Sequence, residues 1–370
     1  MKINDKKIVC VHILNDYSGS PNVLLSTIQA LSDRSIEVDL YTNQYTRGFL
    51  CEAPANKNIV FYKWSSNKYI TFLNYTYSQA SLFFKIIHRY RKVADDTIIY
   101  INTIMPFGAA LAGKLIGAKI IYHVHETSIS PLLLKRILIY IQSRAANLSI
   151  YVSDYLLKTE GHSKQKCIRV YNALNTDFMN NVTRVKDLYN NNGKFNVLMP
   201  CSLKSYKGIY ELLKIASMMK KRDSITFTLV LNASIDETNS FINNNYIPTN
   251  MKVFPEQSSM SKFYRNASLL INLSIVDQWI ETFGLTVLEG MAYGLPCIVP
   301  PRGGPSELIE HNINGYLVDS RENELVVKYI DKIERDTTLW KSMSNTSFER
   351  SKKFTANSYS KDISSAITKL

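Results

Sequence analysis

Residues 269–299 read LLINLSIVDQWIETFGLTVLEGMAYGLPCIV and contain one strand–helix–strand unit. The apolar run Leu269–Leu273 predicts a buried strand, Thr286–Tyr293 has apolar residues at helical spacing, and Pro296–Val299 predicts a second buried strand. Two strands joined through a helix run parallel in one sheet. The unit therefore predicts an α/β protein whose parallel sheets are covered by helices on both faces.

The same alternation extends over the rest of the chain, on both sides of a polar break, LYNNNGK, at residues 188–194. Further strands are expected at Lys7–Leu14, Glu37–Thr42, Ile98–Asn102, Lys119–Val124, Leu148–Val152, Phe195–Pro200 and Thr226–Leu231, and helices at Thr76–Lys92, Phe107–Leu115, Leu132–Arg144 and Ile209–Lys220. We predict two doubly wound, Rossmann-like domains, 1–188 and 189–350. A C-terminal helix at 351–370 follows, and the first domain is its candidate packing partner.

The composition is that of a globular protein. Hydrophobic residues make up 45% and charged residues 20% of the 370 residues, so the chain can bury full cores without disulfides or metal. Its five cysteines are scattered and form no Cys-x-x-Cys pair, which argues against a disulfide framework or a zinc site. No apolar signal segment and no run of about 18 apolar residues is present. We expect a cytoplasmic protein.

The formal net charge of +13 indicates an anionic partner. Nucleic acid, an anionic membrane surface and an anionic substrate all fit such a charge. No RNA-binding aromatic motif, zinc finger or clear helix-turn-helix signature is visible. We therefore expect no nucleic acid.

Two glutamates frame the start of the helix in the opening stretch. Glu281 lies in the loop before it, Gly284 and Leu285 open it, and Glu289 lies on it. The free N–H groups and positive dipole end of a helix N-terminus suit a diphosphate. Glu289 would then accept hydrogen bonds from ribose hydroxyls and Glu281 from a sugar. For either glutamate alone, a plain role in helix initiation is the alternative.

The stretch resembles the E-x7-E signature of family 4 retaining glycosyltransferases, which have the GT-B architecture. More closely, WIETFGLTVLEGMAYGLPCIVPPRGGPSELI at 279–309 is similar to bacterial capsule, exopolysaccharide and O-antigen members. The resemblance implies two parallel sheets that face each other across a cleft. It also implies that Glu289 holds the nucleotide ribose and that Glu281 lies beside the transferred sugar. Backbone N–H groups of Phe283, Gly284 and Leu285 would meet the sugar and the diphosphate.

A basic segment, SLKSYKG at 202–208, resembles the family's Arg-Leu…Lys-Gly segment, whose basic pair grips the diphosphate. Lys207 matches the lysine. Ser202 stands where the family has arginine, and Lys204 is the candidate to replace the missing charge. A solvated surface role for Lys207 is the alternative.

Two segments of the first half carry the remaining candidates. DYSGSP at 16–21 resembles the family's glycine-containing loop, so Gly19 is expected near the donor phosphate and Ser20 on the acceptor side. In YHVHE at 122–126, the resemblance aligns His125 with a histidine beside the donor sugar, and Glu126 is assigned to the acceptor side. A structural histidine and a metal site are the alternatives. Because no third ligand stands at suitable spacing, we expect no metal.

Together these features predict a retaining, metal-independent glycosyltransferase without a cofactor. It would move a sugar from a nucleoside-diphosphate sugar to a glycan or lipid-linked acceptor in bacterial surface polysaccharide synthesis. Glu281, His125 and Lys207 are the expected catalytic residues. A nucleotide-sugar epimerase of the same architecture and a non-catalytic sugar-nucleotide-binding protein are the alternatives.

Two basic amphipathic stretches, Leu82–Lys92 and Leu132–Arg144, suit an anionic lipid surface. They predict peripheral association at the inner face of the cell membrane. The alternative is that both helices pack their apolar faces on the first sheet and leave only the charges in solvent.

Overall fold

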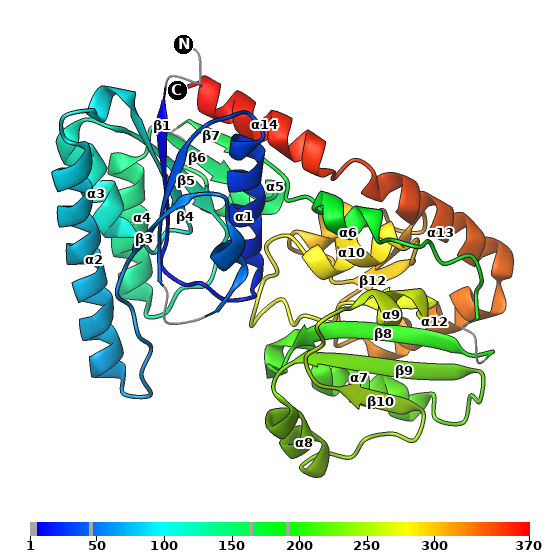
Figure 1. Cartoon of the computed structure of the whole chain (residues 1–370). Helices are drawn as coiled ribbons and strands as arrows, with labels where there is room; N and C mark the ends of the chain where they lie inside the picture. The colour runs from blue at the N-terminus through cyan, green and yellow to red at the C-terminus, as the bar shows by residue number, and fades with distance from the viewer. Residues whose placement is uncertain (1–5, 44–46, 163–165, 190–192) are drawn as a thin grey trace. The chain divides into compact units, whose positions relative to one another are not determined.

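The computed structural model describes residues 6–43, 47–162, 166–189 and 193–370. The chain divides into two compact units (Figure 1). The first is Met1–Ala173 with Ala356–Leu370, and the second is Leu174–Thr355. Each unit contains one parallel sheet, which confirms the predicted α/β class with two Rossmann-like domains. That the two sheets face each other across a cleft stays a prediction.

The sheet of the first unit has the strand order β3-β2-β1-β4-β5-β6-β7. Its strands are β1 (Lys7–His12), β2 (Val38–Thr42), β3 (Asn56–Ile59), β4 (Thr97–Asn102), β5 (Lys119–Val124), β6 (Leu148–Tyr151) and β7 (Cys167–Arg169). Its helices are α1 (Gly19–Ser32), α2 (Lys68–Tyr90), α3 (Phe107–Ile116), α4 (Leu132–Ala145), α5 (Asp154–Glu160) and α14 (Ala356–Thr368). The central strand β4 is buried along its whole length, as expected of a strand covered by helices on both faces.

The sheet of the second unit has the order β10-β9-β8-β11-β12-β13. Its strands are β8 (Phe195–Ser202), β9 (Ile225–Asn232), β10 (Met251–Phe254), β11 (Leu269–Ile271), β12 (Cys297–Val299) and β13 (Gly315–Leu317). Its helices are α6 (Thr176–Asn180), α7 (Ile209–Met218), α8 (Ile235–Asn243), α9 (Ser261–Arg265), α10 (Leu285–Ala292), α11 (Pro305–Leu308), α12 (Asn323–Arg335) and α13 (Thr337–Ser351). Trp340 on α13 is buried and donates to Ser268 O (2.7 Å), which ties α13 to the start of β11.

The units divide the chain at 173/174 rather than at the predicted 188/189. The reason is that the segment after β7 contacts the second unit: the Val185 N–H donates to Tyr293 O (2.8 Å), and the Phe178 ring meets the Tyr293 ring edge-on at 6.0 Å. The middle of the predicted polar break, residues 190–192, lies outside the described residues. The C-terminal helix α14 packs on α1 within the first unit, where Tyr359 OH lies 2.6 Å from Thr27 Oγ1.

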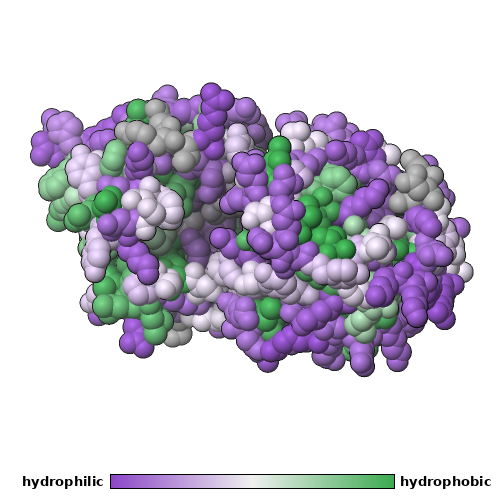
Figure 2. Space-filling model, turned by 90° about the horizontal axis from the view of Figure 1, so that it is seen from below, coloured by the Kyte–Doolittle hydropathy of each residue, from purple (hydrophilic) through white to green (hydrophobic). Residues whose placement is uncertain are grey.

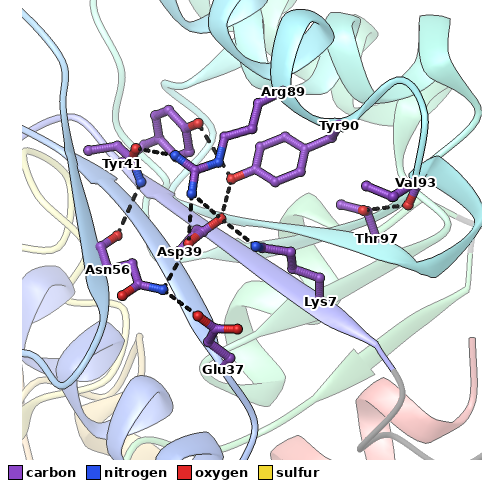
Figure 3. Close-up of polar contacts among 10 residues, drawn as sticks. Lys7, Glu37, Asp39, Tyr41, Asn56, Arg89, Tyr90, Val93 and Thr97 are labelled. Atoms are coloured by element: carbon purple, nitrogen blue, oxygen red, sulfur yellow. Dashed lines mark hydrogen bonds and ion pairs between the residues drawn. The ribbon is translucent and has the colours of Figure 1, made fainter.

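A buried carboxylate fastens α2 to the first sheet. Asp39 on β2 has a fully buried side chain that forms ion pairs with Lys7 and Arg89, both at 3.3 Å (Figure 3). The Tyr90 hydroxyl donates to the same carboxylate at 2.5 Å. A buried charge is tolerated only when it is paired and hydrogen-bonded. Because Arg89 and Tyr90 end α2, this cluster fixes the C-terminal end of that helix.

Helix α2 begins earlier than the sequence predicted, at Lys68 rather than at Thr76. Its first turn is stabilised by Asn67, whose side chain accepts a hydrogen bond from the Tyr69 N–H (2.9 Å) as an N-cap. Helices predicted at Phe107–Leu115, Leu132–Arg144 and Ile209–Lys220 agree with α3, α4 and α7 within a few residues. Within the described residues no helix is long and apolar enough to cross a membrane.

Candidate functional site

The strand order places Lys207 and Glu281 of the second unit, and Gly19 and Asn102 of the first, after strands that flank a reversal of strand order. In an open parallel sheet, ligands bind beyond the carboxyl ends of the strands, where the strand order reverses. In the second unit this switch point lies between β8 and β11, which precede Lys207 and Glu281, respectively. In the first unit it lies between β1 and β4. Gly19 follows β1, and Asn102 ends β4.

Lys207 and Glu281 contact each other in the second unit. The Lys207 ammonium forms an ion pair with the Glu281 carboxylate. It also lies 5.5 Å from the centroid of the Trp279 ring, which in turn stacks on Tyr206 at 5.0 Å. The aromatic pair forms one wall beside the cation, a cation–π arrangement. Sequence reasoning named the two charged residues but missed Tyr206, whose only signal was its place beside Lys207.

A glycine contact brings the Lys207 turn close to the Glu281 loop. Gly208 has φ +79°, and a Cβ there would lie 2.0 Å from Leu273 O. Only glycine fits this position, because it tolerates the left-handed conformation and leaves room for the neighbouring backbone. The Ile275 N–H donates to Tyr206 O (2.8 Å), which joins the two loops once more.

Two glycines before α11, Gly303 and Gly304, pack against the backbone of the Glu281 loop. The Gly304 N–H donates to Glu281 O (2.8 Å). A Cβ at Gly304 would lie 2.2 Å from Phe283 Cα, and one at Gly303 would lie 2.5 Å from Glu281 O. The loop therefore rests on a glycine surface that admits no side chain.

The N-terminus of α10 follows this loop directly. Gly284, its N-cap, has φ +96° and supplies no side-chain cap. The first intrahelical hydrogen bonds run from Val287 and Leu288 to Gly284 O, each 3.1 Å. The N–H groups of Leu285 and Thr286 precede these bonds. They are the donors that a helix start offers to an anion. Phe283 is buried and packs edge-on against Phe354 (6.2 Å).

Glu289 lies on α10 and accepts a hydrogen bond from Tyr264 OH at 2.5 Å. Tyr264 on α9 stacks on Tyr293 (5.2 Å). Burial raises the pKa of Glu289 to about 7, and the Tyr264 hydroxyl opposes that rise. With a pKa near neutral pH, the Glu289 carboxyl changes its charge in response to a small change in its surroundings. Tyr264 was missed by sequence reasoning because its partner lies on another helix.

The raised pKa of Glu289 predicts pH-dependent ligand affinity. The carboxylate accepts from ribose hydroxyls better than the acid does, so affinity for a nucleoside diphosphate should fall as pH drops below about 7. Glu289→Gln should bind more weakly, with the pH dependence largely removed. Titration calorimetry between about pH 6 and about pH 8 measures both. An equal pH slope in wild type and variant would contradict the assignment.

The raised pKa of Glu289 also makes the free energy of unfolding depend on pH. The pKa of about 7 in the folded protein lies above the ordinary value of a glutamate carboxyl, so the folded state holds the proton more tightly than the unfolded state. The stabilisation is present below the unfolded pKa and is lost as pH rises through about 7.

Ser202 and Lys204 are not part of the Lys207–Glu281 ion pair. Ser202 ends β8 opposite Asn232 of β9, and its carbonyl accepts from the Lys204 N–H (2.8 Å). Lys204 is exposed and lowers the pKa of Glu237 on α8, after the two hydrogen bonds from Ser234. The role of Lys204 in replacing the missing arginine stays a prediction.

In the first unit, Asn102 joins three candidate elements. Its Oδ1 lies 2.8 Å from His125 Nε2, and its Nδ2 donates to Ser20 O at 3.0 Å and lies 3.2 Å from His12 Nδ1. Burial, then His123 and His12, lower the pKa of His125 well below its usual range. His125 is therefore a neutral imidazole. With Asn102 Oδ1 as acceptor, its proton is assigned to Nε2, which leaves Nδ1 as an acceptor.

Glu126 and the loop before Gly19 are each positioned by a hydrogen bond within their own segment. Glu126 accepts from the His125 N–H at 3.3 Å, and burial raises its pKa to about 7. Gly19 is the first residue of α1, and Asp16 orders the preceding loop by accepting from the Ser18 N–H (2.9 Å). In the described part of the chain, no three His, Cys, Asp or Glu side chains are placed to hold a metal ion.

The family comparison matches most of the second unit. Residues 183–350 match the family model described as "Glycosyl transferases group 1". Sucrose synthase 2 of Tulipa gesneriana is 40% identical over 74 residues, which cover 19% of this chain and 9% of that protein. Probable sucrose-phosphate synthase 2 of Craterostigma plantagineum is 32% identical over 133 residues, or 35% and 12% of the two chains. The matches span about a tenth of the length of these relatives.

Similar solved structures cover both units. HepE of Anabaena, crystallised with UDP-glucose, has a TM-score of 0.79 at 18% identity over 98% of this chain and 100% of that chain. Sucrose-phosphate synthase of Thermosynechococcus elongatus has a TM-score of 0.77 at 14% identity over 99% of each chain. These likenesses show the GT-B fold, with two parallel-sheet domains.

Proposed function

We propose that the chain is a glycosyltransferase that uses a nucleoside-diphosphate sugar, from the premise that residues 183–350 match the group 1 glycosyl transferase family model. The observation that carries the proposal is the Lys207–Glu281 ion pair at the switch point of the second sheet. The start of α10 follows it directly, and Glu289 lies on that helix. A cation, a helix N-terminus and a carboxylate suit the phosphate and ribose of such a donor.

The donor chemistry follows from these groups. When the bond between the anomeric carbon and the diphosphate breaks, negative charge builds on the leaving phosphate. Lys207 and the N–H groups of Leu285 and Thr286 stabilise that charge without a metal ion. Glu281 holds the Lys207 ammonium before the donor binds and accepts from sugar hydroxyls afterwards. The acceptor hydroxyl oxygen bonds to the anomeric carbon on the face that the diphosphate leaves, and its proton passes to a base, so the configuration is retained.

The first unit contributes His125, Gly19, Ser20 and Glu126 in this proposal. The free Nδ1 of neutral His125 accepts from a hydroxyl of the donor sugar, while Asn102 fixes the ring through Nε2. Since Asn102 also holds Ser20 O, one side chain sets both the histidine and the start of α1. Glu126, with a pKa of about 7, is suited to exchange a proton with an acceptor hydroxyl.

The donor and the acceptor are proposed more narrowly from the relatives. HepE was crystallised with UDP-glucose, so a uridine diphosphate sugar is the first candidate donor. The similarity of residues 279–309 to bacterial polysaccharide enzymes supports a glycan or lipid-linked acceptor in surface polysaccharide synthesis. One of the similar structures is a lipopolysaccharide outer core galactosyltransferase. An epimerase would consume the donor without any acceptor, and a non-catalytic binding protein would leave it intact.

A thermal-shift panel of nucleoside diphosphates and their sugars tests the donor proposal. A ligand that binds only the folded state raises the midpoint in proportion to its affinity and concentration. We expect UDP and at least one UDP-sugar to raise the midpoint in wild type, and Lys207→Met to lose most of the shift. No shift with any nucleoside diphosphate would overturn the proposal.

A further inference from the structure

Three neighbouring helices of the first unit expose large hydrophobic side chains to solvent. Helix α2 packs beside α3, and α3 packs beside α4. Figure 2 shows hydrophobic residues, in green, gathered on the side of the molecule where α2 and α3 lie in Figure 1. The exposed residues of this α2–α3–α4 face are Tyr69, Ile70, Phe72, Leu73, Tyr77 and Phe84 on α2, Leu111 and Leu115 on α3, and Leu132, Leu133, Ile137 and Tyr140 on α4.

Helix α2 is apolar on two opposite sides. Its inner side buries Tyr75, Leu82 and Ile86 at helical spacing. Its outer side carries Tyr69, Leu73, Tyr77 and Phe84, which recur at the same spacing and point away from the core. Tyr69 is 82% exposed, and Phe84 is 67% exposed. A helix that only covers a sheet has one apolar side and one polar side, so the outer stripe is not explained by the fold.

The inner side is held firmly, which makes the outer stripe a fixed surface. Gly108 on α3 lies so close to α2 that a Cβ there would be 2.1 Å from Gln79 O. The Tyr75 hydroxyl donates to Met105 O (2.6 Å), and the Asp39 cluster holds the other end of α2. These contacts set the rotation of α2 about its own axis, so the outer stripe faces solvent.

The face contains cations but no carboxylate. Helices α2, α3 and α4 include no Asp or Glu, and none occurs from residue 53 to residue 94. Exposed cations lie among or beside the apolar residues: Lys68, Arg91, Lys114, Arg136 and Arg144. Exposed aromatic and aliphatic side chains surrounded by Lys and Arg match the boundary between anionic headgroups and acyl chains.

We propose that the α2–α3–α4 face docks on an anionic lipid bilayer, with the α2 stripe entering the interface and the cations meeting lipid phosphates. A second copy of this chain fits the face less well. A two-fold contact pairs the same patch on both copies, so it would oppose cations with cations and offer no carboxylate to neutralise them. Docking goes beyond the proposed transfer reaction, because lipid binding needs no donor.

Only part of the stretch Leu82–Lys92, which the sequence assigned to a membrane surface, is exposed in the structure. In Leu82–Lys92, Leu82 and Ile86 are buried in the core, and Phe84 alone among its large apolar residues is clearly exposed. The strongest part of the face lies earlier on α2, around Tyr69 and Leu73. It was not visible from sequence because that part of the helix was not predicted.

Vesicle flotation of the full chain tests the proposal. We expect binding to vesicles of phosphatidylcholine with phosphatidylglycerol, little binding to phosphatidylcholine alone, and weakening in high salt. The triple variant Tyr69→Ser, Leu73→Ser, Phe84→Ser should lose binding at least roughly tenfold, since the apolar stripe supplies the insertion. A control variant, Ile235→Ser with Tyr246→Ser, removes two exposed hydrophobic residues from the second unit and should bind like wild type.

Two further measurements keep the outcomes distinct. Equal thermal midpoints of the triple variant and wild type show that the variant is folded, and equal midpoint rises with UDP show that the donor site is intact. Equal vesicle binding by wild type and a folded triple variant would overturn the docking proposal. So would a wild-type dimer in sedimentation that the triple variant abolishes. If vesicle binding holds and no nucleoside diphosphate binds, the docking proposal stands and the transferase proposal fails.

Discussion

Replacing Glu281 by glutamine is expected to lower kcat/KM for donor turnover about a hundredfold to a thousandfold, the range for losing one preorganised electrostatic group. The glutamine keeps the size of the side chain and removes its charge. Lys207 then loses the carboxylate that positions its ammonium. In the proposed mechanism the sugar hydroxyls also lose the carboxylate that accepts from them.

The matched control is Glu324→Gln on α12, which removes an exposed carboxylate elsewhere in the second unit. It should leave kcat and KM within about twofold of wild type, as surface substitutions usually do. A double-mutant cycle with Lys207→Met tests the pair itself. Because the two side chains act together, the double variant should be little worse than the poorer single variant. Additive losses would show that Glu281 and Lys207 act independently.

Replacing Gly304 by alanine is expected to disrupt the Glu281 loop and abolish donor binding. Gly304 has φ −60°, which any residue adopts, so the effect is purely one of space. The added Cβ would lie 2.2 Å from Phe283 Cα and 2.3 Å from Thr282 O. Both are backbone atoms, so no side-chain rotation relieves the clash. We expect a loss of about 3 kcal/mol or more in the free energy of unfolding.

The control is Gly117→Ala at the end of α3. That glycine has φ +84°, but a Cβ there meets no atom within 4 Å. It should cost only the conformational strain, about 1–2 kcal/mol, and leave donor binding intact. Denaturant unfolding and thermal shift with UDP compare the two variants. A Gly304→Ala protein as stable and as responsive to UDP as wild type would show that the loop does not rest on this glycine.

The sequence predicted what depends on chain-local patterns. Buried apolar runs such as those of β1 and β8 located the central strands, because a strand covered on both faces is apolar throughout. The edge strands β3 and β7 were missed, since Asn56–Ile59 is polar and largely exposed and Cys167–Arg169 is only three residues long. Helix α2 was shortened because its N-cap, Asn67, was not recognised.

The site was predicted in its parts but not in its contacts. Lys207 and Glu281 were named separately, and their ion pair depends on the adjacency of β8 and β11, which no local pattern encodes. The Tyr264–Glu289 hydrogen bond and the Asn102–His125 contact likewise join residues from different elements. A polar residue at the end of a fully buried strand is a usable signal, and it would have found Asn102.

The most direct test of the central claim is titration calorimetry of UDP into wild type and Lys207→Met. The claim is that the carboxyl edge of the second sheet binds a nucleoside diphosphate through Lys207. Losing one charged hydrogen bond costs about 1.5–3 kcal/mol, so the variant should bind about tenfold to a hundredfold more weakly. Equal affinity of wild type and Lys207→Met for UDP would contradict the claim.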